Sequence, residues 1–158
     1  EWTEIELFPV ASPSLLNTRP LRTVKDLASH IILHADGGRE WQTWLTAAKA
    51  LELGRGPHHF MADARLAMDA ALSGYGVALG DNMTASRLMA NGSLVAPFDL
   101  AVSAVDRFYI TCRSEVKAAP IVNVFIDWLF AERDEEDARA EVPAVARRTV
   151  RRGRKAVA

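Results

Sequence analysis

Residues 61–98 read MADARLAMDAALSGYGVALGDNMTASRLMANGSLVAPF, and this stretch decides the fold. Asp63 is a good N-cap residue, and the alanine-rich segment that follows predicts a helix that ends at Gly74. The buried face expected for this helix comprises Leu66, Ala67, Ala70 and Ala71. The apolar run 77–79 then predicts a short strand that is covered on both faces, as in a parallel sheet.

A second helix and the start of a further strand complete the stretch. Asp81 or Asn82 is expected to cap this helix, and Gly92 is expected to end it. The apolar run 94–98 predicts the strand that follows. The order of elements is therefore helix, strand, helix, strand.

Three glycines in this stretch, Gly74, Gly76 and Gly80, superficially resemble a phosphate-binding loop. In such a loop the chain leaves a strand and enters a helix, so that backbone N–H groups face the phosphate. Here the chain leaves a helix and enters a strand. We therefore interpret the glycines as structural residues and disfavour a nucleotide site.

Upstream of residue 61, strands and helices continue to alternate. Strands are expected at residues 5–10, 31–34 and 58–61. Thr23 and Asp26 have the spacing of a capping box and open a short helix. One apolar helical face is formed by Trp41, Trp44, Leu45 and Ala48, and this helix is expected to run until Gly54. Such alternation indicates an α/β sheet with crossover connections.

Downstream, residues 108–112 predict a strand in which Cys112 is a small buried hydrophobe. Pro120 suits the first turn of a helix, whose buried face would comprise Ile121, Phe125, Trp128 and Leu129. Charged residues dominate from residue 133 onward. We expect one folded domain over residues 1–132 and a charged, disordered tail over residues 133–158.

The composition excludes several classes of protein. The chain has 158 residues and a formal net charge of −1, so it has the size of one domain and no overall attraction to nucleic acid or anionic membranes. No apolar run is long enough to span a membrane, and no signal peptide is visible at the start. Cys112 is the single cysteine, which fits a reducing cytoplasm. The basic run 147–155 could contact DNA or acidic lipid, although a solvated tail is the more common role of such a run.

Candidate catalytic and metal-binding residues do not form a convincing set. His58 and His59 are adjacent on a strand and therefore point to opposite faces, so they cannot chelate one ion. Ser12, His34 and Asp36 could be proposed as a triad, but no nucleophile-elbow motif surrounds the serine. We therefore expect no enzymatic activity, no metal and no cofactor, although a small α/β enzyme stays an alternative.

Seven segments in this order resemble a known family: FPVASP, TVKDL, REWQTWL, SGYGVALG, NGSLVAPF, RFYITC and PIVNVFIDWLFAE. The sequence is similar to the effector-binding domain of LysR-type transcriptional regulators, in the branch of the glycine-cleavage activator and AmpR. The resemblance implies an α/β fold like that of type 2 periplasmic binding proteins, with two lobes joined by crossing strands. This chain would contain mainly the second lobe, with parts of the first. Residues 8–13 and 108–112 would be the crossing strands.

The same resemblance implies a function. Family members are cytoplasmic, form dimers or tetramers, and bind promoter DNA through an N-terminal winged helix-turn-helix. That part and most of the first lobe are absent from this sequence, so we expect a protein truncated at its N-terminus. A solute-binding protein of a transport system with the same fold is the alternative, and the residues upstream of Glu1 would discriminate between the two.

Site residues follow from the rule that ligands of open α/β sheets bind beyond the carboxyl ends of the strands. The effector-binding candidates are Ser12, Pro13, Arg39, Trp41, Asp63, Ala64, Arg65 and Tyr109. The helix start at Asp63 suits an anionic group of a small-molecule effector. Relatives often have a serine at the position of Ala64, and alanine removes that hydroxyl. Trp41 is an open case, because its helical spacing fits a core residue at least as well as a cleft residue.

The missing first lobe has a physical consequence. The helix that begins at Pro120 should expose Ile121, Phe125 and Trp128, which would pack on that lobe in relatives. Exposed apolar patches promote association. We therefore expect the chain to self-associate.

Overall fold

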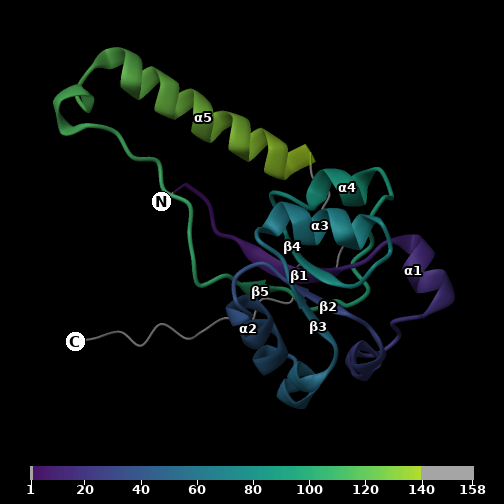
Figure 1. The fold of residues 1–158 in the computed structure, drawn as a ribbon. Helices are drawn as coiled ribbons and strands as arrows, with labels where there is room; N and C mark the ends of the chain where they lie inside the picture. The colour runs from purple at the N-terminus through teal and green to yellow at the C-terminus, as the bar shows by residue number, and fades with distance from the viewer. Residues whose placement is uncertain (1, 140–158) are drawn as a thin grey trace, which may run out of the picture.

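The computed structural model describes residues 2–139, which form an α/β lobe and a long helix beside it (Figure 1). The strands are β1 (Glu6–Val10), β2 (Ile32–His34), β3 (His58–Phe60), β4 (Ala78–Asp81) and β5 (Val102–Ser103). The α-helices are α1 (Pro13–Thr18), α2 (Arg39–Ala47), α3 (Ala64–Leu72), α4 (Ser86–Ala90) and α5 (Pro120–Arg139). Short 3-10 helices cover Val24–Ser29, Leu51–Arg55 and Ser114–Val116.

The strands form a three-stranded sheet and a two-stranded sheet, which a bridge joins side by side. β1 lies between β4 and β5 and is antiparallel to both, while β2 and β3 are parallel. A parallel bridge between Ile32 and Val77 joins the two groups, so the spatial order is β3-β2-β4-β1-β5. The α/β architecture predicted from the alternation of elements is confirmed.

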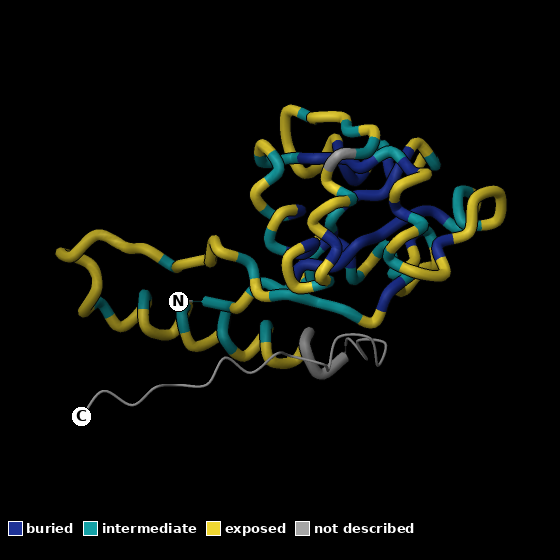
Figure 2. The backbone as a smooth tube through the Cα atoms, turned by 90° about the horizontal axis from the view of Figure 1, so that it is seen from below, coloured by how far each residue is buried: buried dark blue, intermediate teal, exposed yellow. Residues whose placement is uncertain are grey.

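Apolar side chains cover both faces of this sheet. Ile32 packs in a cluster with Trp41 and Trp44 of α2, whereas its neighbour Leu33 packs in a second cluster with Ala67 of α3. Adjacent residues of a strand point to opposite faces, so β2 contributes to two cores. Val77 and Ala78 divide between the same two clusters, which confirms the prediction that the run 77–79 is covered on both faces. Figure 2 shows the buried segments gathered inside the lobe.

The helix predicted after Asp63 forms as α3. The Asp63 carboxylate accepts the Leu66 N–H at 2.9 Å, and Gly74 has a φ of 79° just past the helix. Its buried face differs from the prediction, because Met68 is buried, Leu66 is 42% exposed and Ala70 is only half-buried. Ala67, Met68 and Ala71 belong to the same apolar cluster as Leu33 and Ala78 of the sheet.

The helix after β4 begins later than predicted. The Asp81 carboxylate accepts the N–H groups of Met83 and Thr84, both at 2.8 Å, and thereby stabilises a turn instead of a helix start. α4 begins at Ser86. Aspartate is favourable in both settings, which explains why the sequence does not distinguish them.

α2 ends well before Gly54. Lys49 adopts a left-handed φ of 56°, and the Ala50 N–H donates to the Leu45 carbonyl at 2.9 Å. This is the geometry of a Schellman C-cap, in which glycine is the usual residue. Because lysine occupies the position, the sequence lacks the usual stop signal at this point.

Two predicted strands do not form. Residues 94–98 contribute a single bridge from Val95 to Ala11, and residues 108–112 contribute a single bridge from Phe108 to Thr3. Within residues 2–139 no neighbouring strand pairs with residues 109–112, and an unpaired strand is not stable in water. Cys112 is accordingly exposed, which corrects the expectation that it is buried.

α5 starts at Pro120 as predicted and continues to Arg139, beyond the expected boundary at residue 132. Ile121 is 73% exposed, Phe125 54% and Trp128 52%, so the predicted exposure of these residues is confirmed. Figure 2 shows α5 and the segment that leads to it as mostly exposed. Residues 140–158 lie outside the described part of the chain, and the division into a domain and a tail stays a prediction.

Candidate functional site

The carboxyl ends of three strands, β2, β3 and β4, lie along the same side of the sheet, which we call the carboxyl edge. β2 and β3 are parallel, and Val77 at the start of β4 pairs in parallel with Ile32, so all three strands point the same way. The chain leaves this edge through residues 35–38, 61–63 and 82–85. β1 begins at the same edge, where the Glu6 N–H donates to the Asn82 side chain at 2.9 Å. This edge is where a ligand of an open α/β sheet is expected.

Ser12 and Pro13 lie at the opposite end of the lobe. β1 is antiparallel to β4, and Val10 pairs with Ala78 near the amino end of that strand. Ser12 is 3% exposed, and its hydroxyl caps α1 by accepting the Leu15 N–H at 3.3 Å. The structure therefore does not bring these two residues together with the other candidates, nor Ser12 with His34. The carboxyl-end rule misleads for a strand whose direction is reversed.

Arg39 lines a small hollow of about 50 Å³ between the start of α2 and the segment after β5. The Arg39 guanidinium lies 3.3 Å from the Asp106 carboxylate and 3.6 Å from the Asp36 carboxylate. Asp36 also accepts the backbone N–H groups of Gly38 and Glu40, at 3.0 and 2.9 Å. The arginine is thus paired with carboxylates that precede and follow it in the chain.

Glu40 also lines the hollow, and the sequence did not single it out. Burial is the main cause that raises the pKa of Glu40 above its ordinary value. Neighbouring carboxylates raise it further, namely those of Asp36, Asp81 and Asp106. Carboxylates therefore outnumber the one arginine here, and the hollow suits hydrogen-bond donors or a positively charged group better than an anion. A glutamate in the first turn of a helix resembles an ordinary surface residue, so no local signal reveals its burial.

Trp41 is a core residue. It is 2% exposed, its indole N–H donates to the Leu33 carbonyl at 2.8 Å, and its ring meets Trp44 edge-on at 5.9 Å. A tryptophan held in this way offers no free surface to a ligand. Of the two interpretations of Trp41 left open by the sequence, the geometry favours the core.

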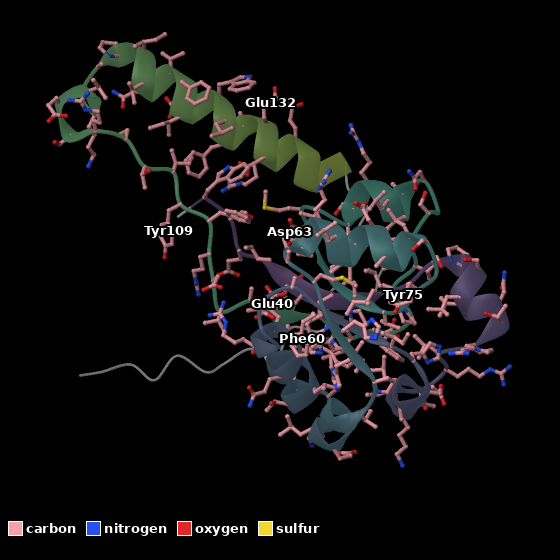
Figure 3. All side chains as sticks on the ribbon, viewed as in Figure 1. Glu40, Phe60, Asp63, Tyr75, Tyr109 and Glu132 are labelled. Atoms are coloured by element: carbon pink, nitrogen blue, oxygen red, sulfur yellow. The ribbon has the colours of Figure 1, made fainter. Side chains whose placement is uncertain are left out.

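The start of α3 is an exposed part of this edge. Asp63 caps the helix, and Ala64 and Arg65 in its first turn are exposed. The backbone N–H groups of a first helical turn have no partner within the helix, and the helix dipole favours an anion near them. Figure 3 shows Asp63 at the end of α3 that faces α5.

Tyr109 lies on the segment that leads from the lobe toward α5 (Figure 3). It is 61% exposed and belongs to no strand. The predicted strand at this position is wrong, while the role of Tyr109 in the site stays a prediction.

Among residues 2–139, no group of three or more His, Cys, Asp or Glu side chains could hold a metal ion. His59 hydrogen-bonds the Tyr75 hydroxyl at 2.9 Å, whereas His58 lies within 2.5 Å of His34. The two adjacent histidines thus have separate partners, as expected for opposite faces of a strand. In the same part of the chain, no helix is both long and apolar enough to cross a membrane.

Comparison with known proteins identifies the family. The family described as the LysR substrate binding domain matches residues 1–134. The chain belongs to the LysR family. The glycine cleavage system transcriptional activator of Escherichia coli K12 is 32% identical over 133 residues, which cover 82% of this chain and 43% of that protein. The HTH-type transcriptional activator AmpR of Providencia stuartii is 31% identical over 115 residues, which cover 73% of this chain and 37% of that protein.

Solved structures of LysR-family regulators share the fold. The effector domain of AmpR from Pseudomonas aeruginosa aligns with a TM-score of 0.63 at 22% identity and covers 89% of this chain and 68% of that one. The regulatory domain of CrgA from Neisseria meningitidis aligns with a TM-score of 0.60 at 19% identity, over 83% of this chain and 66% of that one. The periplasmic-binding-protein-like fold is confirmed.

These relatives are transcriptional regulators, not enzymes or transport proteins, so the LysR effector-binding domain is confirmed over the solute-binding alternative. The chain spans less than half the length of the curated relatives it matches. The LysR-family effector-binding lobe is therefore the part of those regulators to which the described fold corresponds.

Proposed function

We propose that this LysR-family chain senses a small-molecule effector and thereby controls how a winged helix-turn-helix elsewhere in the regulator binds promoter DNA. The observation that carries this proposal is the match of residues 1–134 to the LysR substrate binding domain, together with the open edge at the starts of α2 and α3. A ligand that binds two lobe arrangements with different affinity shifts the population between them. No reaction is needed, so we propose a binding protein without a cofactor that acts in the cytoplasm, where an exposed Cys112 thiol stays reduced.

The proposed site comprises Arg39, Asp63, Ala64, Arg65 and Tyr109. An anionic group of the effector would lie at the first turn of α3, close to the exposed Arg65. The carboxylates near Arg39 would accept hydrogen bonds from another part of the same molecule. Ser12, Pro13 and Trp41 are left out, because the first two lie at the other end of β1 and the third is enclosed in the core.

Arg65→Gln tests the proposed site. In the full-length regulator we expect this variant to need an effector concentration at least about tenfold higher for half-maximal promoter response, because a charge-assisted hydrogen bond is lost. Operator affinity without effector should not change. The measurement is a reporter assay with a panel of small carboxylates and amino acids, together with a DNA mobility shift.

Arg19→Gln is the matched control, since Arg19 is exposed and lies beyond α1 at the opposite end of the lobe. Its response should equal that of the unsubstituted regulator. An unchanged response in Arg65→Gln removes Arg65 from the site. If the unsubstituted full-length protein does not bind promoter DNA at all, the proposed function itself is contradicted.

We also propose that the chain self-associates through the apolar face of α5. Ile121, Val124, Phe125 and Trp128 are each more than half exposed along this helix. An apolar stripe of this kind is stabilised by burial against a second surface. We expect the weight-average mass in sedimentation velocity to rise with concentration, and Phe125→Glu to restore monomers.

Asn123→Glu is the control for charge, because Asn123 is exposed on the same helix and lies outside the apolar stripe. It should associate like the unsubstituted chain. A chain that stays monomeric at high concentration, or equal effects of the two glutamates, would speak against association through this face.

A further inference from the structure

Two histidines are joined directly between β2 and β3. His34 Nε2 and His58 Nδ1 lie 2.5 Å apart, and His34 is only 5% exposed. The Phe60 ring stacks on His34 at 4.6 Å with an angle of 17° between the ring planes, and the Trp41 ring approaches it edge-on at 6.4 Å. The two imidazoles therefore meet in a largely apolar environment.

The geometry fixes the protonation state that the pair can hold. A hydrogen bond between two imidazole nitrogens needs one N–H and one lone pair, which two neutral rings supply. The outer nitrogens, His34 Nδ1 and His58 Nε2, are buried and have no hydrogen-bond partner. In the neutral pair the accepting ring already carries its N–H on its outer nitrogen, so an added proton goes to the other outer nitrogen and leaves two buried N–H groups without an acceptor. Two added protons would set two N–H groups against each other across 2.5 Å.

Few charged groups can offset a proton on this pair. Asp36, in the turn after β2, is the carboxylate that acts on His34, and it already binds Arg39 and two backbone N–H groups. From β3 the facing titratable group is His58 itself, whereas α2 presents the uncharged, non-titratable Trp41 ring. A Cβ on Gly38, the N-cap of α2, would lie 3.4 Å from His34 Nδ1, and the positive end of a helix disfavours a cation there.

The pair joins a strand that has little other support. Within residues 2–139 the ladder partner of β3 is β2, through bonds that include Met61 N–H to the His34 carbonyl at 2.8 Å and Ile32 N–H to the Pro57 carbonyl at 2.9 Å. β3 has three residues, and its side chains are half-buried or exposed. A change at the histidine pair therefore acts on a short edge strand and on the Asp36–Gly38 turn that follows His34.

We propose that the His34–His58 pair is a proton-sensitive link. It holds β3 against β2 when both rings are neutral, and it releases β3 from β2 when protons bind. This regulation goes beyond effector sensing, although it acts beside the turn that carries Asp36 and Arg39. Burial first, and His58 second, lower the pKa of His34 below its ordinary value of 6.5, while Asp36 opposes them. The link is therefore complete above about pH 6.5 and is lost as the pH falls through the lower pKa of the folded state.

Amide hydrogen exchange of the 158-residue chain tests the link. Between pH 7.5 and 5.5 we expect the protection factor of the Met61 N–H, corrected for intrinsic exchange, to fall about tenfold or more. For each ring that the closed state keeps neutral, every pH unit below the pKa of the unfolded state lowers the equilibrium constant for closing by up to about tenfold. The Ala11 N–H, which donates to Val95 in another part of the sheet, should keep its protection and thus exclude global unfolding.

Variants make the test specific. His34→Phe/His58→Leu should abolish the pH dependence at Met61, and His59→Leu, which alters the neighbouring histidine on the other face, should retain it. If the double variant does not fold, imidazole ¹⁵N shifts of the unsubstituted chain decide the matter. The pKa of the His34 imidazole should lie below its ordinary value of 6.5. Titration of His34 at or above pH 6.5, or pH-independent protection of Met61, would overturn the proposal.

Discussion

Gly76→Ala is expected to destabilise the fold by about 2–4 kcal/mol, at the upper end of the range for overpacking. A Cβ at this position would lie 2.5 Å from the Ile31 carbonyl oxygen and 3.0 Å from Leu33 Cγ. The Ile31 carbonyl cannot move away, because it accepts the Val77 N–H at 2.9 Å and so helps to hold β2 against β4. The added methyl group therefore forces apart the bridge between Ile32 and Val77, which joins the β2–β3 pair to the other strands.

Gly92→Ala separates this steric effect from conformational preference. Gly92 has a left-handed φ of 74°, but a Cβ added to it would have no other atom within 4 Å. Alanine there should cost only about 1 kcal/mol, the usual penalty for a left-handed residue with a side chain. Urea unfolding of both variants measures the difference, and equal losses would contradict the steric argument.

Local signals in the sequence predicted local structure well. Asp63 caps α3, Thr23 and Asp26 form their capping box, and Gly74 ends its helix with positive φ. In each case a side chain or a glycine meets the requirement of a backbone only a few residues away. The order of helices and strands follows from such signals, and with it the α/β class of the fold.

Features that depend on distant partners could not be predicted in the same way. Residues 108–112 have the composition of a strand, but within residues 2–139 their pairing is limited to the bridge from Phe108 to Thr3. Ser12 follows a strand whose direction in the sheet is reversed. His34 and His58 are adjacent only because β2 and β3 lie side by side. A one-dimensional pattern contains propensity and periodicity, but neither the register nor the direction of a pairing.

Trp41→Ala is the second large effect that we expect, with a loss of about 3–5 kcal/mol in the free energy of unfolding. The substitution removes a side chain that is 2% exposed, together with its hydrogen bond to the Leu33 carbonyl and its edge-on contact with Trp44. The cavity would open between α2 and β2, where the surrounding rings are too rigid to close it. Denaturant unfolding measures the loss.

Trp128→Ala is the matched control, because it removes the same side chain from α5, where it is 52% exposed. Within a monomer this change should cost less than about 1 kcal/mol, as for most surface substitutions.

Trp41→Phe tests whether Trp41 serves only the core or also contacts the effector. It should lower stability by about 1–2 kcal/mol through the lost N–H donor and ring volume, while the folded protein binds effector unchanged. A variant that keeps its stability but loses the effector would instead place Trp41 in the binding site, so that the same residue decides between the two roles that its sequence pattern left open.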